Sequence, residues 1–215
     1  MKKLSITAVL LILTFTLIAA SVVFAQESVE QYLLNLTQPT VKDYINLMYN
    51  GTHENKLLAA TKLRELKDNS DETIDALIYG LQQGTIYVER QSGKITNDFW
   101  DVRTVSALAL GEIGNPKALP FLYQAVRYEP DNYVRSAIAI AIGKIGKKES
   151  LPEITRMIET ADISGTDDIL LLACIDAIKN IGNREGFIPL VEIIRGKYRR
   201  RVRIAAMEAL KTMKF

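Results

Sequence analysis

The sequence predicts an all-α protein, built as a solenoid of about five short helical repeats. Residues 102–114 and 134–146 are nearly the same phrase at an offset of 32 residues, and each copy ends in Ile-Gly. After each such phrase, a second apolar pattern starts with Leu-Pro or Ile-Pro. A fixed period of this size indicates units that bury their apolar faces only against their neighbours.

The repeat extends in both directions from these two copies. Similar apolar columns occur at residues 58–66, 170–182 and 202–210, which makes five copies in all. The closing glycines suit the left-handed end of a helix. The prolines of the second pattern suit the first turn of a helix, where their missing N–H would have had no partner. We therefore expect pairs of antiparallel helices over residues 54–215.

These residues carry a resemblance to a known family. The order Val-Arg, an alanine-rich middle, Leu-Gly-x-Ile-Gly and then x-Pro resembles HEAT repeats, in particular the short bacterial type first associated with phycobilisome lyases. The resemblance is specific at residues 101–160 and weaker at 167–195. It implies an α-solenoid whose second helices line a concave binding face.

The resemblance also implies a structural ladder between repeats. Arginines recur in one column of the repeat, at Arg103, Arg135 and Arg203. In HEAT repeats, such an arginine and a nearby acid tie neighbouring units together. Asp101 and Asp131 are the expected acids, because they lie next to the first two arginines in the sequence.

The first 25 residues predict a cleaved signal peptide. Lys2 and Lys3 precede an apolar run, and small residues lead to Ala25, after which we expect cleavage. The protein is then periplasmic or secreted; an uncleaved membrane anchor is the alternative. Cleavage would remove two of the 27 basic side chains and none of the 25 acidic ones, which leaves the charges balanced. This balance gives no indication of nucleic-acid binding.

Few side chains suited to catalysis are present. Cys174 is the only cysteine and His53 the only histidine, so the chain has neither a disulfide nor a cluster of metal ligands of these types. We expect Cys174 to be buried and inert, and His53 to lie at a turn or helix start. From these observations we expect no enzymatic activity, no metal and no cofactor.

Two segments depart from the repeat. Residues 26–53 predict a helical segment that caps the first repeat. The interval between the first two copies is about fifteen residues longer than the others, and the extra residues fall at 84–98. Their strand, turn, strand pattern predicts a short β-hairpin or extended loop. Trp100, which follows this insertion, is expected to pack into the core.

The second helices offer the expected binding surface. Aromatic and arginine side chains supply most of the energy at protein interfaces. The repeat register places such side chains in one outward column with close neighbours, and the insertion adds one more: Tyr79, Tyr87, Tyr123, Gln124, Arg127 and Arg156. We therefore expect an exported scaffold or adaptor that binds a protein or peptide.

A basic patch near the C-terminal end suggests an alternative function. Six cations occur in nine residues, and the patch includes Arg195, Lys197, Arg199, Arg200 and Arg201. Such a patch attracts anionic lipid or an acidic protein face. The alternative is therefore a structural, envelope-associated or oligomerising subunit that uses this patch and the last helical layer.

Overall fold

The computed structural model describes residues 39–213, and most of them lie in α-helices. The helices are α2 (Val41–Asn50), α3 (His53–Leu66), α4 (Asp71–Leu81), α5 (Trp100–Ile113), α6 (Leu119–Tyr128), α7 (Asn132–Ile145), α8 (Leu151–Glu159), α9 (Asp168–Ile181), α10 (Phe187–Arg195) and α11 (Arg200–Thr212). The predicted signal peptide, and residues 26–38 of the predicted capping segment, lie outside the described residues.

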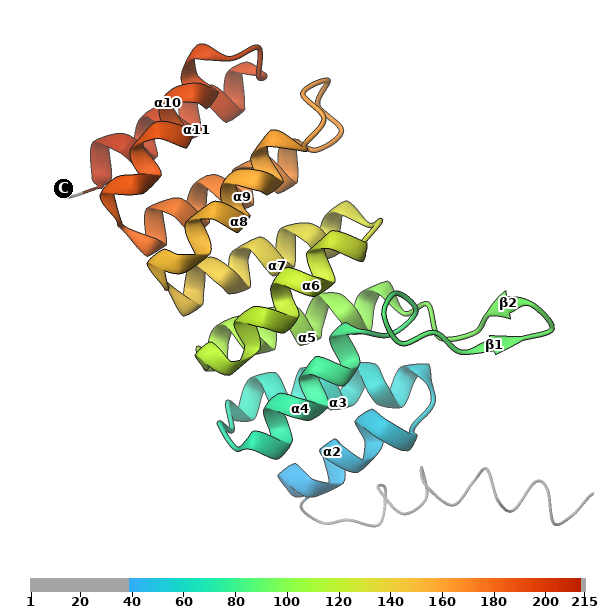
Figure 1. The fold of residues 1–215 in the computed structure, drawn as a ribbon. Coiled ribbons are helices and arrows are strands. Elements are labelled where there is room, and N and C mark those ends of the chain that lie inside the picture. The colour runs from blue at the N-terminus through green and yellow to red at the C-terminus, as the bar shows by residue number, and fades with distance from the viewer. Residues whose placement is uncertain (1–38, 214–215) are drawn as a thin grey trace, which may run out of the picture. The chain divides into compact units, whose positions relative to one another are not determined.

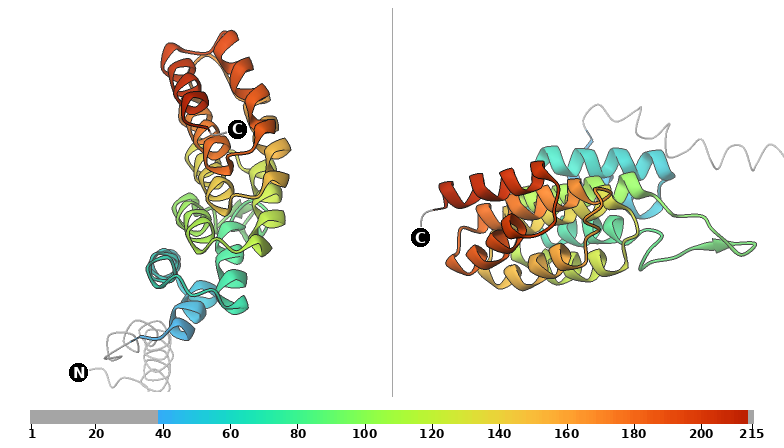
Figure 2. Two further views of the ribbon diagram at one scale, coloured as in Figure 1. Left: turned by 90° about the vertical axis from the view of Figure 1, so that its left-hand side faces the viewer. Right: turned by 90° about the horizontal axis from the view of Figure 1, so that it is seen from above.

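The helices from α3 onward form two layers. The first helices α3, α5, α7, α9 and α11 contact one another in sequence, and each second helix (α4, α6, α8, α10) contacts the first helix of the next unit. Figure 1 shows this stack, and the turned views of Figure 2 show its two rows of helices. The all-α solenoid is confirmed. α2 packs against α3 and α4, at the start of the stack.

The ends of the helices follow the local sequence signals. α5, α7 and α9 each end at the glycine of an Ile-Gly pair, whose positive φ lets its N–H bond to a carbonyl of the last turn. A short 3₁₀ turn follows, and α6 and α8 then begin with a proline in the first turn. These two signals make each connection within a unit short and similar to the others.

Two helical glycines allow the first helices to lie close together. A Cβ atom added at Gly111 would lie 2.4 Å from the Cα of Ala141, and one added at Gly143 would lie 2.5 Å from the Cα of Ala177. Backbone therefore meets backbone where α5 crosses α7 and where α7 crosses α9. The repeated Gly-x-Ile-Gly phrase serves both packing and helix termination.

Glu112 joins three successive first helices. Its Oε1 accepts hydrogen bonds from Arg64 on α3 at 2.6 Å and from Lys144 on α7 at 3.0 Å. The hydrogen bond from Arg64, together with that from Lys144, lowers the pKa of Glu112 from 4.5 to about 2. The folded protein thus holds a carboxylate here under conditions that protonate it in the unfolded chain.

This bridge should make the stability of the fold depend on pH. Between about pH 4.5 and 2 the unfolded state binds the proton at Glu112 and the folded state does not, so stability falls as the pH falls. We expect the difference in unfolding free energy between the wild type and Glu112→Gln to shrink across this interval, as measured by urea unfolding. The exposed Glu72→Gln change is the control. A difference that stays constant with pH would contradict the assignment.

The connections between units and those within units emerge on opposite sides of the stack. Residues 82–99, 129–131, 160–167 and 196–199 link one unit to the next, and with the adjoining helix ends they form what we call the inter-repeat edge. In Figure 1 this edge lies on the right, and the connections within units lie on the left. Of the helices within residues 39–213, none is long and apolar enough to span a bilayer.

The insertion forms a small β-hairpin at the inter-repeat edge. Strands β1 (Arg90–Gln91) and β2 (Lys94–Ile95) are antiparallel, with Arg90 opposite Ile95. Ser92 and Gly93 form the turn with φ values of 51° and 82°, the positive-φ pair typical of two-residue hairpins. Figure 2 shows the hairpin projecting away from the helices. The predicted hairpin after the first repeat is confirmed.

Candidate functional site

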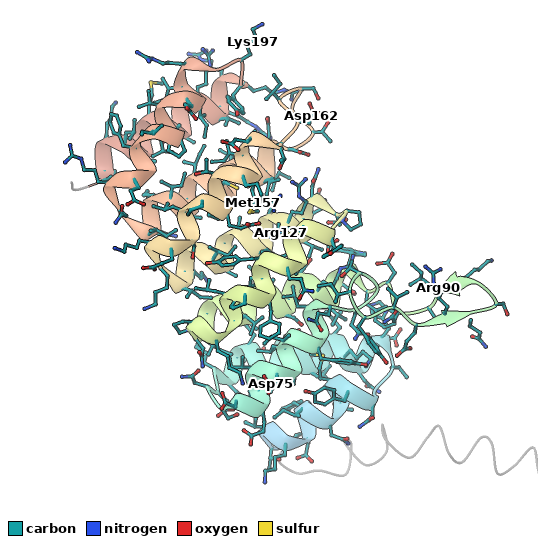
Figure 3. The ribbon with its side chains drawn as sticks, in the orientation of Figure 1. Asp75, Arg90, Arg127, Met157, Asp162 and Lys197 are labelled. Atoms are coloured by element: carbon teal, nitrogen blue, oxygen red, sulfur yellow. The ribbon has the colours of Figure 1, made fainter. Side chains whose placement is uncertain are left out.

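The second helices carry the side chains that the sequence analysis selected for binding. Tyr79 lies on α4, Tyr123, Gln124 and Arg127 on α6, and Arg156 on α8. Gln124 and Arg127 are exposed, and the other three side chains are half-buried. Figure 3 shows Arg127 on the side of α6 that faces the viewer. We call these five residues the second-helix surface.

A buried carboxylate links the arginines of this surface. Glu153 on α8 accepts hydrogen bonds from Arg127 Nη2 at 2.8 Å and from Arg156 Nε at 2.9 Å. Burial raises the pKa of Glu153, but the two arginines outweigh this effect and lower the pKa overall. One Glu153 carboxylate therefore fixes guanidinium groups from two neighbouring units. No sequence pattern indicated this role, since Glu153 simply follows Leu-Pro at the start of a helix.

Tyr123 is positioned across the same pair of helices. Its hydroxyl lies 2.7 Å from Oγ of Ser150, which precedes α8. Ser150 is buried, and the Tyr123 ring is half-buried. This hydrogen bond holds the ring between α6 and α8, so its exposed part is presented with little rotational freedom.

Three tyrosines meet where α2, α4 and the insertion come together; we call Tyr49, Tyr79 and Tyr87 the tyrosine cluster. The ring centroids of Tyr49 and Tyr79 are 4.9 Å apart, and those of Tyr79 and Tyr87 are 5.1 Å apart. Hydrogen bonding with Glu89 and with Tyr79 raises the pKa of Tyr87 to about 12. Tyr79 and Tyr87 were predicted from the sequence. Tyr49 was missed, because it belongs to the segment before the recognisable repeats.

Lys56 contacts both the end of α2 and the tyrosine cluster. Its ammonium group donates to the carbonyl oxygens of Met48 at 2.7 Å and Tyr49 at 3.0 Å, at the end of α2. The same nitrogen lies 4.9 Å from the centroid of the Tyr79 ring, within the range of a cation–π interaction. Burial lowers the pKa of Lys56. One cation thus caps a helix and holds an aromatic ring.

Arg103 anchors the base of the insertion. It is only 1% exposed, and its guanidinium group forms two hydrogen bonds with the Glu129 carboxylate, at 2.8 and 3.0 Å. Nη1 donates to the carbonyl oxygen of Gln83 at 2.9 Å and to Asp98 at 2.7 Å. The two ends of the insertion are therefore tied to each other and to the next connection along the edge.

Asp101 does not pair with Arg103 as expected. It accepts a hydrogen bond at 2.7 Å from His53, whose ring stacks on Phe99 with the centroids 4.3 Å apart. His53 is the first residue of α3, which agrees with the expected helix-start position. The expectation for Trp100 was wrong, since this side chain is 53% exposed. It lies at the first turn of α5, on the side of the helix that faces away from the core.

The arginine column continues along the inter-repeat edge with different acids. Arg135 lies 3.7 Å from Asp167, and its predicted partner Asp131 instead caps α7 by accepting from the N–H groups of Tyr133 and Val134. Arg203 is exposed and forms no ion pair with a described residue. In the last unit Arg201, rather than Arg203, forms the ion pair between units and donates to Asp168 at 2.6 Å.

The basic patch is therefore partly engaged within the protein. Arg199 donates to the carbonyl oxygen of Ser164, and its guanidinium group approaches the same Asp168 carboxylate to 4.0 Å. Arg195, Lys197 and Arg200 are exposed. Figure 3 shows Lys197 near the end of the stack and Asp162 in the loop before α9. Only part of the predicted patch remains available for lipid or an acidic protein.

Cys174 is fully buried on α9, and burial raises the pKa of its thiol to about 12. This thiol is therefore protonated at neutral pH and out of contact with solvent. Among residues 39–213, no group of three or more His, Cys, Asp or Glu side chains is arranged to hold a metal ion.

The repeats are similar to known proteins in sequence and in fold. Residues 94–166 are similar to the family of HEAT repeats, which confirms the resemblance for this segment. The fold is similar to a solved structure of the complex of CpcE and CpcF of phycocyanin lyase from Nostoc sp. PCC7120. That similarity has a TM-score of 0.65 at 22% identity, and covers 84% of this chain and 67% of the other. None of the curated proteins matches this chain.

One prediction is corrected by this similarity. The scarcity of histidine and cysteine led us to expect no enzymatic activity, but the same fold occurs in the structure of a lyase. A stack of helical repeats without a recognisable catalytic motif is therefore compatible with a role in an enzyme. The composition of this chain does not exclude one.

Proposed function

We propose that this chain is an exported helical-repeat scaffold that binds a protein or peptide through the second-helix surface and the tyrosine cluster. The observation that carries the proposal is the cluster itself. Tyr49 and Tyr87 are exposed although their rings adjoin the half-buried Tyr79. The ammonium group of Lys56 holds the Tyr79 ring in place. Rigid, partly exposed aromatic rings lose little entropy when a partner covers them.

The arginines of the second-helix surface support the same function. Arg127 and Arg156 are held by Glu153, so their guanidinium groups are already ordered before a partner binds. Tyrosine and arginine are the side chains that most often dominate binding energy at interfaces. Export is supported by the charged, apolar and small-residue order of residues 1–25.

Photo-crosslinking in the native envelope tests this proposal. A photoreactive residue is placed at Tyr87, at Tyr123, and at Leu58 as a control, because Leu58 is exposed on the first-helix layer. We expect one dominant protein to be captured from positions 87 and 123 but not from 58. Capture should be lost in the combined variant Tyr79→Ala, Tyr123→Ala and Arg156→Ala, with helicity unchanged.

Other crosslinking results would contradict the proposal. Equal capture from Leu58 would mean that contact is nonspecific. Capture that instead depends on Arg195, Lys197 and Arg200 would favour the envelope-associated or oligomerising subunit. Fractionation of the cells in the same experiment tests export, since a chain that stays in the cytoplasm contradicts that part.

A second candidate is a role in a lyase complex. The similarity to the CpcE and CpcF complex favours it, because the matched fold there belongs to a phycocyanin lyase. The test is to incubate the chain with chromophore-free apo-phycocyanin and the free chromophore, and to measure the absorbance of the denatured phycocyanin. Covalent attachment above the level measured without the chain would support this candidate. Attachment no greater than that level would contradict it.

A further inference from the structure

The outer face of α11 is not covered by a further helix of the described chain. In the inner units, each first helix has one face covered by the first helix of the next unit. This face holds Ala107 and Gly111 on α5, and Ala139 and Gly143 on α7. Both alanines are buried, and both glycines meet the backbone of the following helix. Within residues 39–213, α11 packs against α9 and α10, so its equivalent face lies at the end of the stack (Figure 1).

Large apolar side chains occupy this face of α11 and stay partly exposed. The repeat register places Met207 where α5 has Ala107 and α7 has Ala139. Met207 is 41% exposed, and Ile204, in the preceding turn, is 37% exposed. Together with Ile194 of α10, these side chains line a groove of about 330 Å³. The groove therefore lies where the next first helix packs in the inner units.

Two arginines of α11 complete the lining of this groove. Arg200 and Arg203 are both exposed, and neither forms an ion pair with a described residue. Lys211, one turn after Met207, is also exposed and has no such pair among the described residues. The floor of the groove is thus apolar, and its rim is positively charged. We call the lining residues the end groove: Ile194, Arg200, Arg203, Ile204 and Met207.

The acids of α10 and α11 lie away from the end groove. Each helix contains one acid, Glu192 on α10 and Glu208 on α11. At about 3.6 residues per turn, Glu208 lies about 140° around α11 from Arg203, and Glu192 lies about 160° around α10 from Ile194. Neither carboxylate lines the groove. The positive charge of the rim is therefore available to a partner.

We propose that the end groove binds an amphipathic α-helix of a partner protein, with Asp and Glu beside its apolar stripe. The inner units fill the equivalent position with a helix, and an apolar groove of this kind receives the apolar stripe of an amphipathic helix. The acidic side chains of the partner then form charge-assisted hydrogen bonds with Arg200 and Arg203. The charge of the rim selects an acidic helix over a basic one.

Two other occupants fit the end groove less well. A second copy bound through the same groove would place Arg200 and Arg203 against their own equivalents, since a two-fold interface brings the same surface together. A bilayer surface presents no ridge of side chains to fill a groove between two helices. The end groove lies in the last layer and the tyrosine cluster at the first, so this proposal does not depend on the one made for the second helices.

A labelled helical peptide tests the proposal. The probe is (Leu-Glu-Ala-Leu-Glu-Glu-Ala)2 carrying fluorescein, added to the full chain; its leucines form one stripe with glutamates on the flanks. We expect a saturable rise in fluorescence anisotropy that weakens at about 0.5 M salt, because salt screens exposed charges. The lysine peptide (Leu-Lys-Ala-Leu-Lys-Lys-Ala)2 keeps the stripe and should bind at least about ten-fold more weakly.

Reversing the charge of the rim tests the arginines. Arg200→Glu combined with Arg203→Glu should weaken binding of the glutamate peptide by at least about ten-fold, and should strengthen binding of the lysine peptide. The matched control combines Lys147→Glu with Lys148→Glu. It reverses two exposed cations on a connection of an inner unit, and should leave both affinities unchanged.

A second pair of variants tests the apolar floor. Met207→Ser should weaken binding by about five-fold, because less apolar surface is then removed from water. Leu58→Ser is the matched control, since Leu58 also stands on a first helix and is 43% exposed. It should leave the affinity unchanged. Both side chains are partly exposed, so we expect the circular dichroism spectrum to stay the same in both variants.

Several results would overturn the proposal. These are no saturable rise, equal affinity for the two peptides, or an equal loss of affinity in the control variants. Displacement of the glutamate peptide by phosphatidylglycerol vesicles, but not by phosphatidylcholine vesicles, would assign the groove to a membrane surface. Dimers of the chain that dissociate in Met207→Ser would show that a second copy covers the groove instead.

Discussion

Replacing Arg103 by methionine is expected to lower the free energy of unfolding by about 3–5 kcal/mol, the cost typical of removing one partner from a buried ion pair. The reason is that Glu129, whose side chain is only 2% exposed, would keep its carboxylate without the two hydrogen bonds that compensate its burial. For a chain of this size the change corresponds to a fall in melting temperature of about 10 °C, measurable by circular dichroism.

Two comparisons separate this effect from a general loss of charge. Lys62→Met breaks an exposed pair with Glu65, and should cost less than about 1 kcal/mol. Adding Glu129→Leu to Arg103→Met should recover part of the lost stability, because no uncompensated carboxylate remains. Failure of this recovery would mean that Arg103 acts mainly through its packing.

The effect of Arg103→Met can also be measured locally, at the base of the insertion. Arg103 Nη1 bonds to Gln83 and Asp98 at the two ends of the insertion. We expect faster hydrogen exchange of the amides of Gly84 and Glu89 in Arg103→Met, because these amides bond within the anchored base. Unchanged exchange there would contradict the anchoring role.

The helices and their ends could be predicted because their causes are local. An Ile-Gly end and a Leu-Pro start act within one turn of helix, and the same phrase recurs every unit. The hairpin could be predicted for the same reason, since Ser92 and Gly93 lie between two short β-prone runs. Where one residue and its neighbours in the chain determine the local structure, the sequence pattern is sufficient to predict that structure.

The ladder acids could not be predicted in this way. Arg103 pairs with Glu129, which is 26 residues away, because the return of the chain through α6 brings the next connection beside the start of α5. The adjacent acids were the wrong choice, since Asp131 is needed at a helix cap and Asp101 pairs with His53. The buried acid that pairs with Arg103 and the acid nearest to Arg135 both belong to the connection that follows the arginine's own helix pair.

The residues of the candidate site were likewise predictable only where local sequence determines them. The repeat register brought out Tyr79, Gln124 and Arg156, but register alone does not reveal the carboxylate of Glu153 that orders the arginines. Tyr49 precedes the recognisable repeats, and the environment of Trp100 depends on the rotation of a helix start. Both require the three-dimensional arrangement of the first unit and its insertion.

Gly143→Val is expected to destabilise the fold by about 3 kcal/mol, the upper end of the cost of overpacking a core. An added Cβ would lie 2.5 Å from Cα and 2.8 Å from Cβ of Ala177, so α7 and α9 would have to separate. The contacted Cα is part of the backbone and cannot rotate away. Urea unfolding should show a lower midpoint, and Asp176→Val on an exposed face of α9 controls for the helix propensity of valine.

The alanine variant distinguishes packing from backbone entropy. Alanine in place of a helical glycine gains about 1 kcal/mol from propensity alone, so Gly143→Ala would stabilise the protein if the contact with α9 were unimportant. We expect it to destabilise instead, less than valine does, and to be partly rescued by Ala177→Gly, which removes the opposing Cβ. A stabilised Gly143→Ala variant would show that α7 and α9 can separate at little cost. In that case, close approach of the first helices would not be what holds successive units together.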